Sequence, residues 1–223
     1  MVEIIPAILE SDWREIENKI NLVKDFSLWV QIDVSDGIFT PDTTWNNPSD
    51  LKTHLEASPP SEKISVEVDL MVKDPELVIV DWVDAGVRRV IIHIESTDDA
   101  GRAIKIAKEA GAETGLALNI DTPNEILDKY MTDIDFVQFM GIAKIGFQSQ
   151  PFDEKVLHKI EGLRLRYPDA IISVDGGVNM KTVPLLAKVG VDRLVAGSAV
   201  YSSKDKVKNS WEELGNLANN PKH

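Results

Sequence analysis

The chain has 223 residues, enough for a sizeable core in one domain, and 43% of them are hydrophobic and 27% charged, as in ordinary globular proteins. A formal net charge of −13 argues against a general nucleic-acid binder, because no basic stripe could neutralise the phosphates. The lack of cysteine excludes disulfides and thiolate metal sites, and without a visible signal peptide or a membrane-length apolar run we expect a cytoplasmic protein with no membrane partner.

Apolar runs alternate with amphipathic stretches from one end of the chain to the other. In the first half the pattern predicts, in order, a strand over 4–9, a helix over 11–26, a strand over 28–34, a helix over 49–57, a strand over 64–72, a helix over 74–85, a strand over 90–94 and a helix over 97–110. The second half predicts a strand over 115–119, a helix from 122, a strand over 136–140, an irregular loop over 145–151, a helix up to 167, a strand over 170–174, a helix over 179–189, a strand over 193–196, a helix over 204–217 and a frayed tail from 219.

These elements form eight strand–helix units with no linker-like change of composition. Regular alternation of strands and helices predicts a parallel sheet, and eight units predict a closed (β/α)8 barrel that takes up residues 1–223 as one domain. A doubly wound open sheet is the alternative. It is disfavoured because the first strand is followed by Leu9-Glu10-Ser11-Asp12 rather than by a glycine-rich dinucleotide loop.

Polar residues gather at the predicted carboxyl ends of the strands, where (β/α)8 barrels place their chemistry. They are Glu10, Gln31, Asp33, Asp36, Asp69, His93, Glu95, Asn119 and Asp175. Such an acidic cluster must raise some pKa values, bind a cation or spread into solvent. Asp33 lies inside an apolar run, where an ionised carboxylate is costly unless it is paired or bound to metal. Asp36 is equally consistent with a functional role and with capping a turn.

Two glycine-containing turns suggest a phosphate site. Gly176-Gly177 opens the helix after the seventh strand, and Gly197-Ser198 follows the eighth. Barrels often hold phosphate on these two loops through backbone N–H groups, and the alternative is an ordinary strand-to-helix turn at each position.

Motifs spread over nearly the whole chain resemble the ribulose-phosphate 3-epimerase family. They are Pro6-Ala7-Ile8-Leu9 with Asp12, Asp33-Val34-Ser35-Asp36-Gly37, Leu70-Met71-Val72, His93-Ile94-Glu95, Leu118-Asn119 with Thr122-Pro123, Gly146-Phe147 with Gln150 and Phe152, Val174-Asp175-Gly176-Gly177-Val178 and Val195-Ala196-Gly197-Ser198-Ala199. The resemblance implies a metal-dependent TIM barrel of the ribulose-phosphate-binding type that inverts C3 of ribulose 5-phosphate to give xylulose 5-phosphate. It assigns Asp33 and Asp175 as the two acid–base groups, and Gly146, Gly176, Gly177, Gly197 and Ser198 to the substrate and its phosphate.

The chain departs from the family at both metal-binding histidines, which are Gln31 and Asp69 here. The remaining ligand set of Gln31, Asp33, Asp69 and Asp175 offers only oxygen donors. This set moves the preference from the zinc or iron of the family toward Mg²⁺ or Mn²⁺, unless the metal has been abandoned. In the substrate loop, Gln148-Ser149 replaces a glycine pair of the family.

We therefore expect a sugar-phosphate epimerase. Two alternatives stay open: a non-catalytic sugar-phosphate-binding homologue, and a lyase or epimerase of a related ketose phosphate in which Glu10 or Asp69 has an acid–base role. His93 is expected to be a structural histidine bonded to Glu95 or the backbone. Trp45 is considered as an exposed partner contact or as a side chain packed under its own loop, and a homo-oligomer is left open.

Overall fold

Eight parallel strands form a closed barrel in the computed structural model, which describes residues 1–59, 64–147 and 150–220. Each strand pairs with its neighbours in chain order, and β1 pairs with β8. The strands are β1 (Glu3–Ile8), β2 (Trp29–Ser35), β3 (Ser65–Met71), β4 (Arg89–His93), β5 (Glu113–Leu118), β6 (Phe136–Met140), β7 (Ile172–Asp175) and β8 (Arg193–Ala196). The predicted (β/α)8 barrel is confirmed, and the open doubly wound sheet is wrong.

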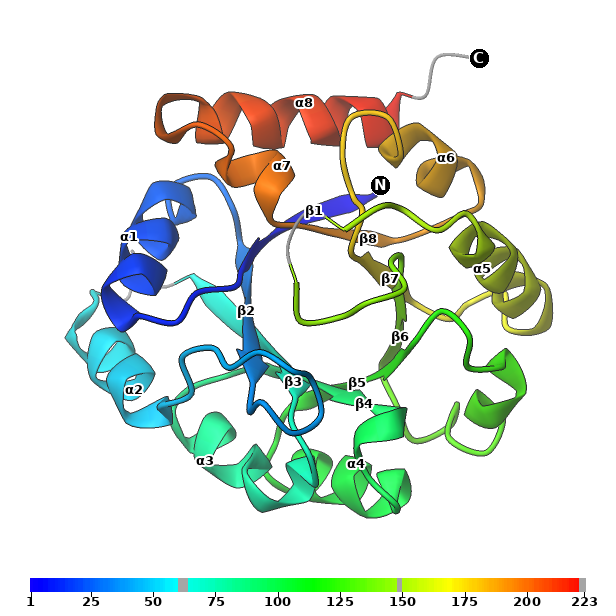
Figure 1. Cartoon of the computed structure of the whole chain (residues 1–223), viewed down its shortest axis with the longest axis horizontal. Helices are drawn as coiled ribbons and strands as arrows, with labels where there is room; N and C mark the ends of the chain where they lie inside the picture. Colours follow the sequence, from blue (N-terminus) through cyan, green and yellow to red (C-terminus); the bar gives the residue numbers. More distant parts are fainter. Residues whose placement is uncertain (60–63, 148–149, 221–223) are drawn as a thin grey trace.

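Helices surround this ring of strands on the outside (Figure 1). The α-helices are α1 (Trp13–Val23), α2 (Pro48–Ala57), α3 (Ile79–Asp84), α4 (Ala100–Glu109), α5 (Lys155–Arg166), α6 (Val183–Lys188), α7 (Ser198–Tyr201) and α8 (Val207–Asn219). Short 3₁₀ turns are η2 (Pro75–Leu77), η3 (Ile94–Ser96), η4 (Asn124–Leu127) and η5 (Lys204–Lys206). No helix in these described ranges is long and apolar enough to cross a membrane.

Four predicted helices differ from the structure, and the one predicted over 204–217 consists of η5 followed by α8. The helix predicted over 74–85 is split into η2 and α3, because Val78 leaves the helical region with a φ of −121°. The helix predicted from residue 122 is only the turn η4, which is followed by an aspartate-rich segment of low helix propensity. The helix predicted over 179–189 begins at Val183, because the Asn179 side chain accepts hydrogen bonds from Lys181 N and Thr182 N in a separate turn.

The predicted frayed tail is wrong at its first residue. The Asn219 side chain accepts a hydrogen bond from Val2 N at 2.7 Å and donates one to Val2 O at 3.0 Å. The end of α8 is thus hydrogen-bonded to the beginning of the chain. The sequence around Asn219 did not indicate this contact.

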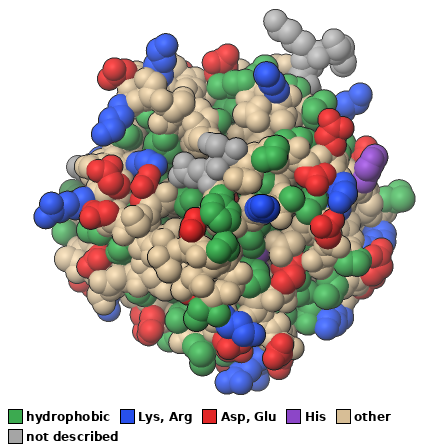
Figure 2. All heavy atoms as spheres, viewed as in Figure 1, with side chains coloured by type: hydrophobic (Ala, Val, Ile, Leu, Met, Phe, Trp, Pro, Cys, Tyr) green, Lys and Arg blue, Asp and Glu red, His purple; other side chains and the backbone are tan. Residues whose placement is uncertain are grey.

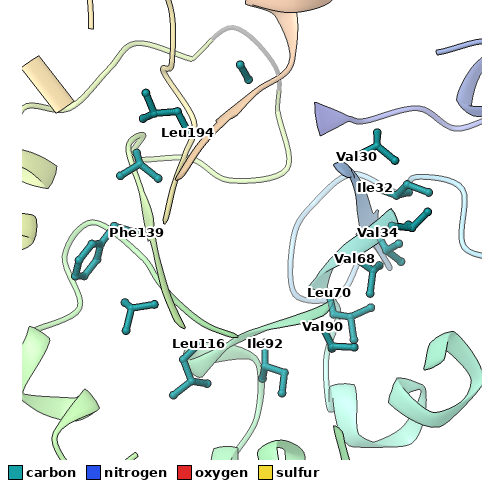
Figure 3. Close-up of a cluster of buried hydrophobic side chains, with 14 of the residues drawn as sticks. Val30, Ile32, Val34, Val68, Leu70, Val90, Ile92, Leu116, Phe139 and Leu194 are labelled. Atoms are coloured by element: carbon teal, nitrogen blue, oxygen red, sulfur yellow. The ribbon is translucent and has the colours of Figure 1, made fainter. Parts of the chain in front are cut away.

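Two side-chain layers alternate along every strand, as the two-residue period of a β-strand requires. Apolar residues such as Val30, Ile32 and Val34 point away from the barrel axis and pack against the helices (Figure 3). The residues between them, including Gln31 and Asp33, point into the barrel, where they bond across it. The main hydrophobic core therefore lies outside the barrel wall, and the interior is free to carry polar groups.

An ionic network fills the amino-terminal end of the barrel. Arg89 contacts Glu67 at 3.2 Å and Glu113 at 2.8 Å, Arg193 contacts Glu113 at 3.2 Å, and the Arg89 guanidinium lies 3.4 Å from the centre of the Trp29 ring. Burial raises the pKa of Glu67 to about 7 despite its pairing with Arg89. This network closes one end, so the polar groups of the strand carboxyl ends face the other.

That carboxyl-end face carries acidic and basic side chains interspersed around its rim (Figure 2). Small groups of hydrophobic side chains lie between them. The excess of acidic residues is thus spread over this face rather than gathered in one area.

Candidate active site

The central feature of the site is an amide that joins two carboxylates. Gln31 Nε2 on β2 donates hydrogen bonds to Asp33 Oδ1 and to Asp175 Oδ2 on β7, each at 2.7 Å. Gln31 is fully buried and Asp33 is 9% exposed. The barrel thereby brings together the two aspartates that stand 142 positions apart in the chain, 33 and 175.

A second buried pair lies beside them. His93 Nε2 on β4 is 3.0 Å from Asp69 Oδ1 on β3, and Gln138 Nε2 on β6 donates to Asp69 Oδ2 at 3.4 Å. Ser173 Oγ in turn donates to Gln138 Oε1 at 3.1 Å. Both oxygens of the Asp69 carboxylate are therefore held, one from the neighbouring strand β4 and the other from β6, which does not pair with β3. The Phe39 ring packs over this pair, with its centre 5.4 Å from that of the His93 ring.

Burial and mutual repulsion set the protonation of the carboxylates. Desolvation raises the pKa of Asp33 well above its ordinary value, and the charges of Asp175 and Asp69 raise it further. Desolvation and Asp69 likewise raise the pKa of Asp175, while the Gln31 hydrogen bond opposes the rise. Two adjacent carboxylates with raised pKa values can share a proton, so one can act as an acid while the other acts as a base.

A cavity of about 250 Å³ opens above this pair. Its wall includes both aspartates and every glycine and serine predicted to bind substrate or phosphate: Asp33, Gly146, Asp175, Gly176, Gly177, Gly197 and Ser198. Met71, Met140 and Asn179 complete part of the wall. The structure therefore gathers the predicted residues around one cavity, and Gln148 and Ser149 lie outside the described residues.

Gly176 and Gly177 are needed in the cavity wall for steric reasons. Their φ angles are +92° and +71°, a region that favours glycine. A Cβ at Gly176 would lie 2.7 Å from Ile142, and one at Gly177 would lie 2.9 Å from Phe152. These positions leave backbone groups next to the cavity without side chains in between.

The carboxylate cluster fits a metal ion by its donors and spacing. One ligand atom from each of Asp33, Asp69 and Asp175 lies within 4.8 Å of the others. Gln31 Oε1 is buried and has no hydrogen-bond partner among the described residues. Buried carboxylates at this spacing repel one another unless protons or a cation neutralise them. The cluster could therefore hold a metal ion.

Other acidic residues at the strand ends have different tasks. Asp36 accepts hydrogen bonds from Ile38 N, Phe39 N and Lys73 N, so it ties two loops together. Burial alone would raise the pKa of Asp36, but these backbone donors lower it below its ordinary value. The turn-capping interpretation is thus the one that the structure supports.

Glu10 and Glu95 also lie away from the cavity wall. Glu10 pairs with Lys19 at 2.5 Å, and Glu95 accepts hydrogen bonds from Asn119 N and Thr122 Oγ1. These two carboxylates therefore lie outside the cluster, since Glu10 pairs with Lys19 of α1 and Glu95 accepts from donors that follow β5.

The partner predicted for His93 is wrong. Its ring bonds to Asp69 instead of to Glu95 or the backbone, because His93 faces into the barrel from the strand next to β3. Gln138 and Ser173 were missed as parts of the site. They could have been found from the two-residue alternation of a β-strand. Both are polar residues inside short apolar strands, and Ser173 stands two positions before Asp175, on the same face of β7.

Solved structures of low sequence identity share the fold. The 3-hexulose-6-phosphate synthase from Salmonella typhimurium matches with a TM-score of 0.74 at 19% identity and covers 97% of this chain and 98% of its own. The protein named KGPDC from Streptococcus mutans matches with a TM-score of 0.77 at 14% identity, covering 98% of this chain and 97% of its own. At such identity these likenesses concern the barrel alone.

Sequence comparison is more specific. The chain is 34% identical over 214 residues to the ribulose-phosphate 3-epimerase of Bacillus subtilis, covering 93% of this chain and 96% of that one. It is 31% identical over 214 residues to the enzyme of the same name from Candida glabrata, covering 91% and 87%. The model of the ribulose-phosphate 3 epimerase family matches residues 3–201. The chain therefore belongs to the ribulose-phosphate 3-epimerase family, a family of isomerase-type enzymes.

Proposed function

We propose that this protein interconverts ribulose 5-phosphate and xylulose 5-phosphate by proton transfer at C3, with Asp33 and Asp175 as the acid–base pair. The observation that carries the proposal is the placement of these two carboxylates, from β2 and β7, on one cavity with raised pKa values. Inversion at a carbon acid needs one acid–base group on each face of the substrate.

In the proposed reaction the ionised carboxylate of one aspartate removes the C3 proton, and the C3–H electron pair passes into an enediolate. The protonated carboxylate of the other aspartate then delivers a proton to the opposite face of C3. One proton leaves and one returns, so the substrate changes only its configuration. The turnover moves the shared proton from Asp175 to Asp33 or back, and exchange with water resets the pair.

The glycine-containing loops support the phosphate end of the proposal. Gly176, Gly177, Gly197 and Ser198 line the cavity and offer backbone N–H groups and one hydroxyl. Because the cavity wall carries no side chain at the three glycines, a phosphate could approach the backbone closely.

The proposed cofactor is a hard divalent cation, Mg²⁺ or Mn²⁺, held by Asp33, Asp69 and Asp175. Their donors are all oxygen, which suits these ions better than zinc or iron. When bound, such a cation stabilises the negative charge of an enediolate as a Lewis acid. Gln31 stays a prediction as a fourth ligand, as do a homo-oligomer and a place in the cytoplasm.

The test is incubation of the purified protein and ribulose 5-phosphate in deuterium oxide, with Mg²⁺ or Mn²⁺ and with chelator. We expect xylulose 5-phosphate carrying deuterium at C3, and activity reduced by about 10²–10⁴-fold in Asp33→Asn and Asp175→Asn. Asp81→Asn, an exposed carboxylate on α3, is the charge-matched control and should retain activity. Binding of the sugar phosphate without exchange or inversion would instead identify a non-catalytic binding protein.

A further inference from the structure

We propose that Gln31 is a positioning residue, whose single amide nitrogen fixes the Asp33 and Asp175 carboxylates relative to each other. The inference rests on the proposed function, in which these carboxylates act on opposite faces of one carbon. It concerns the contact that Gln31 itself makes with each of them at 2.7 Å.

The orientation of the amide follows from its partners. A primary amide nitrogen has two N–H donors, and Gln31 uses one on each carboxylate. The reverse orientation would bring the amide oxygen against two acceptors. Gln31 is also fully buried, so no water can take over either bond without a change of structure.

The backbone does not provide this coupling. In the barrel β2 pairs with β1 and β3, whereas β7 pairs with β6 and β8, so Asp33 and Asp175 are not on neighbouring strands. Gln31 spans the interior between strands that share no backbone hydrogen bonds. Its two N–H groups also offset the repulsion that would turn two adjacent carboxylates away from each other.

A positioning role has a distinctive consequence for the reaction. If the pair is misaligned, the aspartate that removed the C3 proton can return a deuteron to the same face before the other delivers one. Exchange without inversion then rises relative to inversion. A merely structural defect lowers the amount of active enzyme and reduces exchange and inversion by the same factor.

The experiment compares wild type with Gln31→Met, which keeps the side-chain length and removes both donors. Asn124→Leu is the control, because it removes an amide that bonds Lys159 O at 2.7 Å outside the barrel. For Gln31→Met we expect kcat to fall about 10²-fold, with KM changed less than about 3-fold, as for a misplaced catalytic group. The ratio of deuterated ribulose 5-phosphate to xylulose 5-phosphate should rise at least about 5-fold over wild type. The reason is that misalignment slows the proton delivery to the opposite face of C3.

An unchanged ratio in Gln31→Met would overturn the inference, even with reduced kcat. If Gln31→Met does not fold, Gln31→Leu repeats the test, since it also lacks donors. If wild type neither exchanges nor inverts, the proposed function fails, and crystal structures of wild type and variant decide the positioning role. Carboxylates of Asp33 and Asp175 that turn apart in the variant would support it, and unmoved carboxylates would overturn it.

Discussion

His93 Nε2 lies 3.0 Å from Asp69 Oδ1, and neither side chain has any exposure to solvent. Burial alone would lower the pKa of His93, but the Asp69 carboxylate raises it above its ordinary value. The pair therefore compensates charge inside a barrel where both groups would be costly alone. Its two members come from adjacent strands, so a substitution at one changes the environment of the other.

Removing both members should cost less stability than the sum of the costs of removing each one. His93→Leu leaves the Asp69 carboxylate buried with one partner fewer, and we expect it to reduce the free energy of unfolding by about 3–5 kcal/mol. The double variant Asp69→Leu/His93→Leu should lose clearly less than the sum of the two single variants. Urea unfolding followed by circular dichroism measures all four proteins of the cycle.

The control for this cycle is His158→Leu, a histidine whose side chain is 87% exposed, which should change stability by less than about 0.5 kcal/mol. Additive losses for Asp69 and His93 would show that the pair is not coupled.

The sequence was sufficient for the barrel because its information is local. Each apolar run has a length and spacing that admit one kind of element, and eight repeats leave one simple closed arrangement. The aspartates at positions 33 and 175 were found because a charged residue at the end of an apolar strand has few structural explanations. Gly176, Gly177 and Gly197 were singled out because they follow the seventh and eighth strands, whereas Gly146 came from the resemblance to the family.

Contacts across the barrel could not be predicted from the sequence. The partner of His93 depends on which residues of β3 and β4 share a level of the barrel, and register is not visible in a single strand. The amide of Gln31 was expected to face a metal ion. Its nitrogen bonds two carboxylates, a contact that depends on the side-chain positions of β2 and β7 together.

The Asp36 carboxylate should stabilise the fold in a pH-dependent way. Asp36→Asn replaces an acceptor oxygen by an N–H₂ group, and the change should cost about 1–2 kcal/mol at pH 7. The pKa of Asp36 is lowered in the folded state, so its contribution is present above the unfolded pKa of about 3.9 and is lost as pH falls through the folded value.

Urea unfolding of wild type and Asp36→Asn at pH 7 and near pH 3.5 tests this sign. The difference between their free energies of unfolding should be smaller at the lower pH. Asp42→Asn, an exposed carboxylate of the same loop, serves as the control. A gap that widens on acidification would contradict the assignment.

Trp45 is part of the core rather than an exposed contact. It is 7% exposed, its ring centre lies 4.9 Å from that of Trp13 and 5.5 Å from that of Trp82, and its Nε1 donates to Asp50 Oδ2 at 3.0 Å. We expect Trp45→Ala to cost about 3–5 kcal/mol through the cavity it leaves. Trp45→Phe keeps most of the ring packing and should cost less. Circular dichroism in urea measures both, and an alanine variant as stable as wild type would contradict this packing.

A divalent cation should stabilise the folded protein independently of catalysis. The three carboxylates meet only in the folded state, so binding there raises the free energy of unfolding by about 2.7 kcal/mol at a free cation concentration 100 times its Kd. Elemental analysis should find about one Mg²⁺ or Mn²⁺ per chain, as expected when one cluster binds one hard cation.

Asp69→Asn should abolish the stabilisation, because it removes one of the three charges that bind the cation. Asp81→Asn provides the matched control, since it removes a carboxylate of the same size from the surface of α3. If neither Mg²⁺, Mn²⁺, Zn²⁺ nor Fe²⁺ shifts the unfolding transition, the carboxylates must be neutralised by protons instead. Proton transfer by Asp33 and Asp175 would then proceed without a cation, and epimerisation should survive exhaustive treatment with chelator.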